Sequence, residues 1–359
     1  MKLVVFGLAI TSAWGNGHAT LWRALCRGLA RRGHQLVFFE RDVPWYARAR
    51  DLGAMPGLEV VLYTDWDSVR PQAERALRGA EVGIVTSYCP DGVPAATLVQ
   101  SAALPARVFY DLDTPVTLEQ LDAGALPDWL PPDGLAGFDL VLSFTGGAAL
   151  DRLRRDLGAR RVAPLYGSVD PEAHHPVRAV AEYRADLSYL GTYAVDRQPA
   201  LEALFIEPAR HLPGKRFVIA GAQYPQDFPW TLNIHFLRHM PPPLHPAFFA
   251  SSRITLNVTR RAMAAMGWCP SGRLFEAAAC GAPVLSDAWD GLDEFYAPGE
   301  EILIARDTGD ALAALSLGST ELRRIAARAR ARTLEEHGCD RRAAELEAAL
   351  ARIGAPVGA

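Results

Sequence analysis

Residues 271–287 read SGRLFEAAACGAPVLSD, and this stretch joins a short helix to a buried strand through one glycine. Alanine, leucine and phenylalanine dominate residues 272–280, which favours a helix with an apolar face. Gly281 permits the turn that ends the helix. The apolar run 282–286 has the length and composition of a strand that is buried on both faces. The segment is therefore one helix–strand unit of a parallel α/β fold.

The same alternation continues on both sides of this unit. Further strands in the C-terminal half are expected at 187–191, 216–220, 234–237, 254–258 and 301–305. Helices are expected at 198–211, 246–252, 321–337 and 341–352. Repeated strand–helix alternation is typical of a parallel sheet covered by helices on both faces.

The N-terminal half has the same pattern. Its strands are expected at 2–8, 35–40, 58–63, 81–86, 106–110, 139–144 and 161–164, with a first helix at 19–32. Residues 167–178, GSVDPEAHHPVR, have no periodicity and are interpreted as a linker. We therefore predict two Rossmann-like, doubly wound domains facing a central cleft, at 1–168 and 169–340, and a C-terminal helix at 341–359 that crosses back to the first domain.

Composition excludes several classes of protein. The 359 residues are 50% hydrophobic and carry a net charge of −4, so neither disorder nor nucleic-acid binding is expected. The five cysteines form no CxxC pair, which favours reduced thiols, and Cys280 is expected to be buried rather than a nucleophile. Apolar runs are too short to span a bilayer. We expect a cytoplasmic protein.

The first candidate site follows the first strand, in WGNGHATLW at 14–22. Gly15, Asn16 and Gly17 form a loop whose backbone can approach a substrate, and His18 begins the next helix. Histidine can exchange a proton near neutral pH, so His18 is a candidate general base acting through Nε2. The alternative is a helix-capping loop with an incidental histidine.

A second candidate, FYDLDTP at 109–115, ends another strand of the same half. Asp111 or Asp113 could orient an imidazole and stabilise its protonated form. The alternative is turn chemistry, in which Asp113 caps the following helix.

Two segments of the C-terminal half carry anion-binding chemistry. In LSYLGTYAVDRQP at 187–199, Gly191 allows close backbone approach, Thr192 offers a hydroxyl and Arg197 can bind a diphosphate. In the opening stretch, Arg273 and Glu276 lie one helical turn apart. Arg273 could neutralise phosphate and Glu276 could accept hydrogen bonds from ribose hydroxyls; an intrahelical ion pair is the alternative.

These residues resemble the GT-B glycosyltransferases. FEAAACGAPV at 275–284 is similar to the donor-site signature FEAxACGxPV of the group 1 enzymes. The strings FGLAITSAWGNGHATLWRAL, FFERDVPWY, FYDLDTPVTL, LSYLGTY and SSRITLNVTR resemble, in order, the spore-maturation CgeB-like branch. The resemblance implies a donor site at Gly191, Thr192, Arg197, Arg273 and Glu276, with the acceptor bound by the N-terminal domain.

The stereochemical outcome stays open. Many retaining group 1 enzymes carry a second glutamate eight positions before the ribose-binding one, where this chain has Trp268. Conversely, GHATLWRALCRGLARRGH resembles the opening of inverting enzymes whose histidine is the base. Those enzymes place an aspartate partner about a hundred residues later, and Asp111 and Asp113 follow His18 by 93 and 95 residues (111 − 18 and 113 − 18).

The sequence thus predicts a hexosyltransferase-type glycosyltransferase that moves a sugar from a nucleotide-diphosphate-sugar, with UDP-sugar as the expected donor, to an unidentified acceptor hydroxyl. The alternatives are a nucleotide-sugar epimerase of GT-B fold and a non-catalytic sugar-nucleotide-binding protein. No cofactor or metal is expected, because no DxD follows a strand of the donor domain. The acceptor could be a saccharide, a protein or a small molecule. The arginine-rich run 323–332 allows weak peripheral membrane contact, with a solvated helix face as the alternative.

Overall fold

The computed structural model describes residues 1–353. The chain divides into two compact units, one containing Met1–Ser168 and the chain from Cys339 onward, the other Val169–Gly338. The second unit ends two residues before the expected position 340, because Cys339 and Asp340 already pack on the first unit: the Asp340 carboxylate lies 3.3 Å from Arg31. Of the expected C-terminal segment 341–359, residues 354–359 lie outside the described part of the chain.

The first unit is built on a parallel sheet with strand order β3-β2-β1-β4-β5-β6-β7. Its strands are β1 (Lys2–Gly7), β2 (Gln35–Arg41), β3 (Leu58–Tyr63), β4 (Val82–Thr86), β5 (Ala106–Asp111), β6 (Leu140–Ser143) and β7 (Val162–Pro164). The central strands β1 and β4 are buried along nearly their whole length, as their apolar runs predict.

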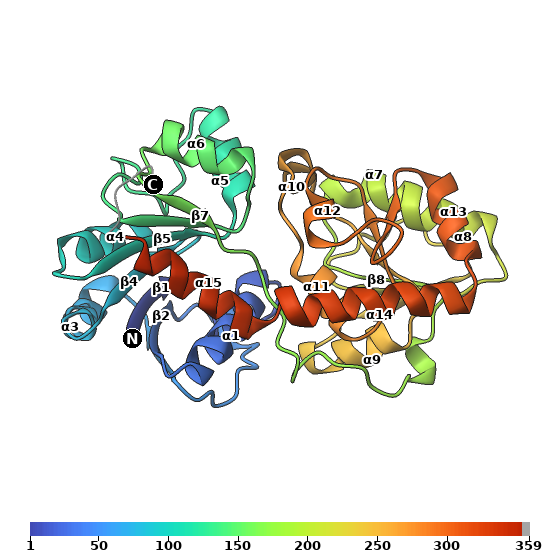
Figure 1. Ribbon diagram of the computed structural model, residues 1–359, viewed down its shortest axis with the longest axis horizontal. Helices are drawn as coiled ribbons and strands as arrows, with labels where there is room; N and C mark the ends of the chain where they lie inside the picture. The colour runs from blue at the N-terminus through green and yellow to red at the C-terminus, as the bar shows by residue number, and fades with distance from the viewer. Residues whose placement is uncertain (354–359) are drawn as a thin grey trace. The chain divides into compact units, whose positions relative to one another are not determined.

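Helices connect these strands (Figure 1). They are α1 (Gly17–Arg31), α2 (Pro44–Ala47), α3 (Trp66–Leu77), α4 (Gly92–Ser101), α5 (Thr114–Asp122) and α6 (Ala148–Leu157). Buried side chains from both layers, among them Phe6, Phe39, Phe109 and Phe138, form one core. The alternation predicted from sequence is therefore present element by element.

The C-terminal helix α15 (Cys339–Ala351) belongs to this unit and packs along α1 (Figure 1). A glycine in α1 allows the contact, because a Cβ on Gly28 would lie 2.3 Å from the carbonyl oxygen of Cys339. Glu347 of α15 fixes the other end: its carboxylate lies 2.5 Å from both Arg32 and His34. Hydrogen bonds from Arg32 and His34 lower the pKa of Glu347 to about 2.

The second unit repeats the architecture, with strand order β10-β9-β8-β11-β12-β13 in a parallel sheet. The strands are β8 (Leu187–Leu190), β9 (Phe217–Gly221), β10 (Ile234–Arg238), β11 (Thr255–Asn257), β12 (Val284–Asp287) and β13 (Leu303–Ala305). The α-helices are α7 (Gln198–Leu201), α8 (Glu207–His211), α9 (His245–Ala250), α10 (Arg261–Met266), α11 (Gly272–Ala279), α12 (Leu292–Phe295), α13 (Thr308–Ser316) and α14 (Ser319–Glu336).

The helix expected at 198–211 contains an irregular turn. A π-helical segment, Glu202–Ile206, lies between α7 and α8, with Pro199 and Pro208 at the start of each. Proline provides no backbone N–H, so the regular hydrogen-bond ladder is interrupted there. Short 3₁₀ turns occur at Ala181–Tyr183, Val195–Arg197 and Pro242–Leu244.

The arginine-rich run lies on α14, which packs beside α11 (Figure 1). Arg324, Arg328 and Arg332 pair with glutamates of the same unit at 2.6, 2.6 and 3.0 Å. Arg330 donates through Nε to the carbonyl of Ala279 at the end of α11. These contacts agree with a structured helix face. Among residues 1–353, no helix is long and apolar enough to cross a membrane.

In each sheet the strand order reverses beside the first strand of the unit. The switch lies between β1 and β4 in the first unit and between β8 and β11 in the second. Ligands of open parallel sheets bind beyond the carboxyl ends of the strands at such points. The loops after these strands carry the residues singled out from the sequence.

Candidate functional site

The loop after β1 is held by its own polar groups. Asn16 caps α1: its Oδ1 accepts from the backbone N–H of His18 at 3.0 Å, and its Nδ2 donates to the carbonyls of Ala9 and Ser12. Gly15 has a φ of 61°, a left-handed conformation that glycine adopts readily. The side chain of Asn16 is thus used within the loop, whereas a Cβ on Gly15 or Gly17 would meet no atom within 4 Å.

His18 and the acids after β5 are brought together. The Nε2 of His18 lies 2.6 Å from Oδ2 of Asp113, and both side chains are largely buried. The same Asp113 oxygen accepts from the hydroxyl of Ser87, which follows β4, at 3.2 Å. Loops from β1, β4 and β5 therefore meet at one point of the first unit.

Asp111 lies behind this pair, at the end of β5, and is fully buried. Burial, and then the charge of Asp113, raise the pKa of Asp111 to about 7. One Asp111 oxygen accepts from the backbone N–H of Asp113 at 3.1 Å, which orders the turn between the two acids. Asp113 is therefore the acid that contacts the imidazole, and Asp111 shapes the turn.

The geometry differs from the predicted base in one respect. Asp113 occupies Nε2 of His18, the atom expected to accept a proton, and Nδ1 is buried with no hydrogen-bond partner among the described residues. Beside the imidazole, Tyr88 has a φ of 57°, rare for an aromatic residue, and stacks on Trp129 with ring centroids 4.2 Å apart. The catalytic roles of His18, Asp111 and Asp113 stay predictions.

In the second unit, the chain after β8 lies against β9. Gly191 donates to the carbonyl of Ala220 at 2.9 Å and accepts from the hydroxyl of Tyr224 at 3.1 Å. A Cβ on Gly191 would lie 2.5 Å from the hydroxyl oxygen of Tyr189, which is 2% exposed. Only glycine fits here without displacing a buried tyrosine.

Two arginines near this turn have unused donors. Arg197 donates through Nη1 to the carbonyl of Thr192 at 3.2 Å, but its Nε is buried without a partner among residues 1–353. The Nε of Arg273, at the start of α11, is likewise buried and unpaired. Burial lowers the pKa of Arg197, and the positive charges of Arg273 and Arg260 lower it further, although Tyr189 and Asp196 oppose them. The two guanidinium groups therefore form a positive site with unsatisfied N–H donors.

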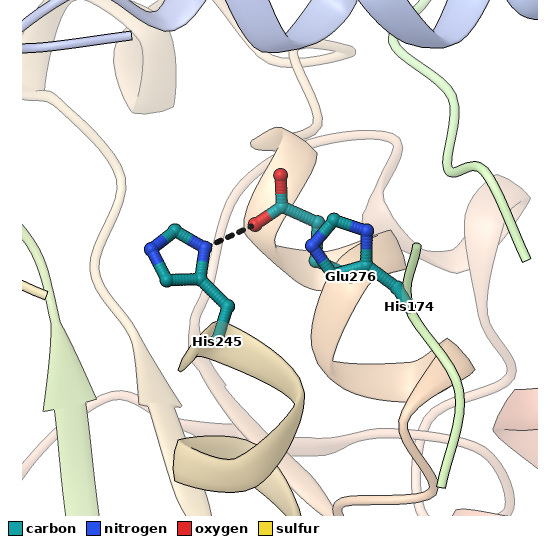
Figure 2. A group of neighbouring side chains, drawn as sticks. All are labelled: His174, His245 and Glu276. Atoms are coloured by element: carbon teal, nitrogen blue, oxygen red, sulfur yellow. Dashed lines mark ion pairs between the residues drawn. The ribbon is translucent and has the colours of Figure 1, made fainter. Parts of the chain in front are cut away.

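Glu276 lies one turn along α11 from Arg273, and its side chain is 12% exposed. The structure has no ion pair between the two side chains among the described residues, so the intrahelical alternative is not supported. Instead Oε2 of Glu276 lies 3.9 Å from Nδ1 of His245, and His174 is close by (Figure 2). Burial raises the pKa of Glu276, but His174, His245 and Arg273 outweigh it, so the net shift is downward. Glu276 is thus held as a carboxylate.

The tautomer of His245 follows from its second nitrogen. Nε2 lies 3.1 Å from the carbonyl oxygen of Met240, which can only accept, so Nε2 carries the hydrogen. Burial lowers the pKa of His245 to about 4, with Arg273 opposing the effect of Glu276. At neutral pH, Nδ1 therefore presents a lone pair toward the Glu276 carboxylate. Two buried acceptors face each other and need a donor or a cation between them.

Sequence reasoning missed His174 and His245. They come from the linker and from the start of α9, and are separated from Glu276 by about a hundred and about thirty residues. No spacing rule connects such positions. The only local signal was the HH pair in the linker, at 174–175.

Trp268 and Cys280, which were singled out in the sequence, do not add to this chemistry. Trp268 has a φ of 44° and donates through Nε1 to Glu294 at 2.7 Å, so an indole stands at the position noted in the sequence. Burial raises the pKa of the Cys280 thiol to about 12, which leaves it unreactive at neutral pH.

The fold matches solved glycosyltransferases. Sucrose-phosphate synthase from Thermosynechococcus elongatus aligns with a TM-score of 0.70 and 14% identity over 98% of both chains. HepE of Anabaena, solved with UDP and glucose, aligns at 0.66 and 11%, covering 98% of this chain and 99% of its own. An α-glucosyltransferase solved with UDP-glucose and DNA aligns at 0.70 and 11%, with the same coverage. The chain therefore has the GT-B fold.

The sequence itself matches a family model over part of its length. Residues 197–348 match the family described as glycosyl transferase-like. The match includes Arg197, Arg273 and Glu276, the charged residues of the candidate site in the second unit. No curated protein sequence matches the chain.

Proposed function

We propose that the protein is a glycosyltransferase that binds a nucleotide-diphosphate-sugar, with UDP-sugar as the expected donor, in its second unit and transfers the sugar to an acceptor hydroxyl. The observation that carries the proposal is the pair of buried guanidinium Nε atoms at Arg197 and Arg273, which have no hydrogen-bond partner among the described residues. Arg273 lies one helical turn from Glu276 on α11. The site thus has a positively charged side, formed by the two arginines, and a negatively charged side, formed by Glu276.

The arginine side of the site suits a diphosphate. Guanidinium groups bind phosphate oxygens with paired N–H donors, and a buried donor left unpaired costs free energy. Gly191 and Thr192 follow β8 at the switch point, where backbone can approach the phosphates. A diphosphate would offset the repulsion between Arg197 and Arg273 and satisfy both Nε atoms.

The glutamate side suits a ribose. Each ribose hydroxyl can donate one hydrogen bond, and Glu276 together with Nδ1 of His245 offers acceptors that face each other 3.9 Å apart. Among residues 1–353, Nδ1 of His245 has no hydrogen-bond partner. A diphosphate on the arginines and a ribose on Glu276 would place a nucleoside diphosphate along α11.

For the first unit we propose acceptor binding near the loop of Gly15, Asn16 and Gly17. His18 and Asp113 form the candidate proton-transfer pair. Because Asp113 contacts Nε2, a base role requires the imidazole to turn so that one nitrogen reaches the acceptor hydroxyl. Catalysis is proposed to need no metal, since Arg197 and Arg273 already supply positive charge for the leaving diphosphate.

The test is turnover in the presence of EDTA. The full chain is incubated with a panel of nucleotide-sugars and candidate acceptors, and glycosylated product is followed by mass spectrometry. Transfer to an acceptor that Arg273→Met abolishes would support the proposal. Conversion of UDP-sugar alone to an epimer would instead identify an epimerase, and binding without any conversion would identify a sugar-nucleotide-binding protein.

A further inference from the structure

Three side chains of the second unit converge although they lie far apart in the sequence. His174 comes from the linker, His245 from the first residue of α9 and Glu276 from α11 (Figure 2). Their ligand atoms all lie within 4.8 Å of one another. As whole residues, His245 is 8% exposed and Glu276 is 9% exposed, and His174 is partly buried with both of its ring nitrogens shielded from solvent.

Several polar atoms of the cluster lack hydrogen-bond partners among the described residues. Nδ1 of His245 and both ring nitrogens of His174 are buried without a hydrogen-bond partner among the described residues. The carbonyl of Met240 fixes a hydrogen on Nε2 of His245, which leaves Nδ1 as the ring nitrogen that faces Glu276. A neutral imidazole whose other nitrogen is fixed by a backbone carbonyl is the arrangement that metal-ligating histidines use.

We propose that His174, His245 and Glu276 bind a transition-metal ion such as Zn²⁺ in the nucleotide-free protein, and that the ion competes with the ribose of a nucleotide. The competition rests on the proposed function, because it requires the ribose to contact Glu276. The metal site itself does not.

The donor set fits this class of ion. Two imidazoles and one carboxylate form a recognised three-residue zinc set that leaves one position open, whereas Mg²⁺ and Ca²⁺ prefer oxygen ligands. Zinc bonds of about 2.0–2.1 Å place tetrahedral ligand atoms about 3.3 Å apart. The 3.9 Å between His245 Nδ1 and Glu276 Oε2 is close to that spacing, and the other pairs lie within 4.8 Å, so side-chain rotations must shorten these distances when an ion binds.

Metal binding has a direct functional consequence. An ion held by Glu276 and His245 occupies the two acceptors that would otherwise receive the ribose hydroxyls. Zn²⁺ would therefore inhibit donor binding rather than assist catalysis. Release of the ion would leave the acceptors free for the nucleotide.

The test uses the full chain, freed of metal, and isothermal titration with Zn²⁺ alone. We expect one ion per chain, and at least about tenfold weaker binding in His174→Ala or His245→Ala. His211→Ala is the matched control, because His211 also faces a glutamate, Glu207, at 4.0 Å but lies exposed on α8. Mg²⁺ should give no binding heat.

The visible absorption of Co²⁺ bound in place of Zn²⁺ gives a second readout, since it reports coordination geometry independently of activity. If His245→Ala does not fold, His174→Ala still decides the result, because His174 lies in the linker rather than in a regular element. Zn²⁺ affinity that neither histidine substitution changes would overturn the metal site and leave the proposed function untouched.

Competition is tested with uridine, which has no phosphates to chelate the metal. Uridine should weaken Zn²⁺ binding, whereas 2′,3′-dideoxyuridine at the same concentration should not. Histidine-dependent Zn²⁺ binding that uridine leaves unchanged would support the metal site and overturn its link to ribose, and with it the ribose role of Glu276.

Discussion

Replacement of Arg197 by methionine separates a ligand-binding arginine from a structural one. Methionine keeps most of the apolar length of the side chain and removes the charge. In the ligand-free protein, burial and the neighbouring positive charges of Arg273 and Arg260 lower the pKa of Arg197, so its charged form is disfavoured there. At neutral pH the charge is present and so is this penalty. Arg197→Met should therefore leave the melting temperature unchanged or raise it.

The same substitution should weaken nucleotide binding. A hydrogen bond to a charged group contributes about 1.5–3 kcal/mol, which corresponds to about a 10- to 100-fold change in dissociation constant. Among residues 1–353, the one side-chain hydrogen bond of Arg197 runs from Nη1 to the carbonyl of Thr192, and its Nε is unpaired, so further donors remain available for phosphate oxygens. UDP should lose this affinity, whereas uridine should lose none.

The assay combines differential scanning fluorimetry of the free protein with calorimetric titration of UDP and uridine. Arg210→Met is the matched control: Arg210 is an exposed arginine of the same unit that pairs with Glu202 at 2.7 Å, and its loss should not change UDP binding. A lower melting temperature with unchanged UDP affinity in Arg197→Met would show that Arg197 is structural and would refute the reasoning.

Three further changes test other parts of the molecule. Burial raises the pKa of Asp111 to about 7 from 3.8, so its contribution to stability is fully present below pH about 4 and is lost as pH rises through 7. Asp111→Asn should therefore remove a pH dependence on the order of 4 kcal/mol from the free energy of unfolding measured in urea. A pH profile of stability that the substitution leaves unchanged would contradict this burial. Gly191→Ala should cost about 1–3 kcal/mol through contact with Tyr189, and adding Tyr189→Phe should recover part of the loss; equal losses would mean that the hydroxyl is not the obstacle. His18→Ala should lower turnover about 10²–10⁴-fold without changing UDP affinity, and undiminished turnover would exclude the His18–Asp113 pair from catalysis.

The fold was largely predictable because its signals are local. Most strands of both sheets are short apolar runs, and glycine or proline lies near the ends of several of them. The π-helical turn at Glu202–Ile206 was not predicted: Pro199 and Pro208 mark where the hydrogen-bond ladder is interrupted, but the residues of the turn itself are ordinary helix formers. The end of the second unit at Gly338 was missed by two residues, because it depends on packing of Cys339 against Gly28, about three hundred residues away.

The candidate site was predictable only where its residues follow strands or share a helix. Arg273 and Glu276 share a helix face, and Arg197 follows β8, so their positions could be read from the sequence. The partners of Glu276 could not, because His174 and His245 reach it only through the fold. For the same reason, the sequence could not show which ring nitrogen of His18 lies against Asp113.

The proposed nucleotide site depends most directly on Glu276, and calorimetric titration of UDP against the wild-type chain and Glu276→Gln tests it. Glutamine keeps the shape of the side chain and one acceptor oxygen but removes the charge that the surrounding groups hold in place. The substitution should raise the dissociation constant for UDP about tenfold or more, with 2′,3′-dideoxy-UDP bound equally weakly by both proteins. UDP affinity that is unchanged in a folded Glu276→Gln variant would contradict the assignment of a nucleotide to this site.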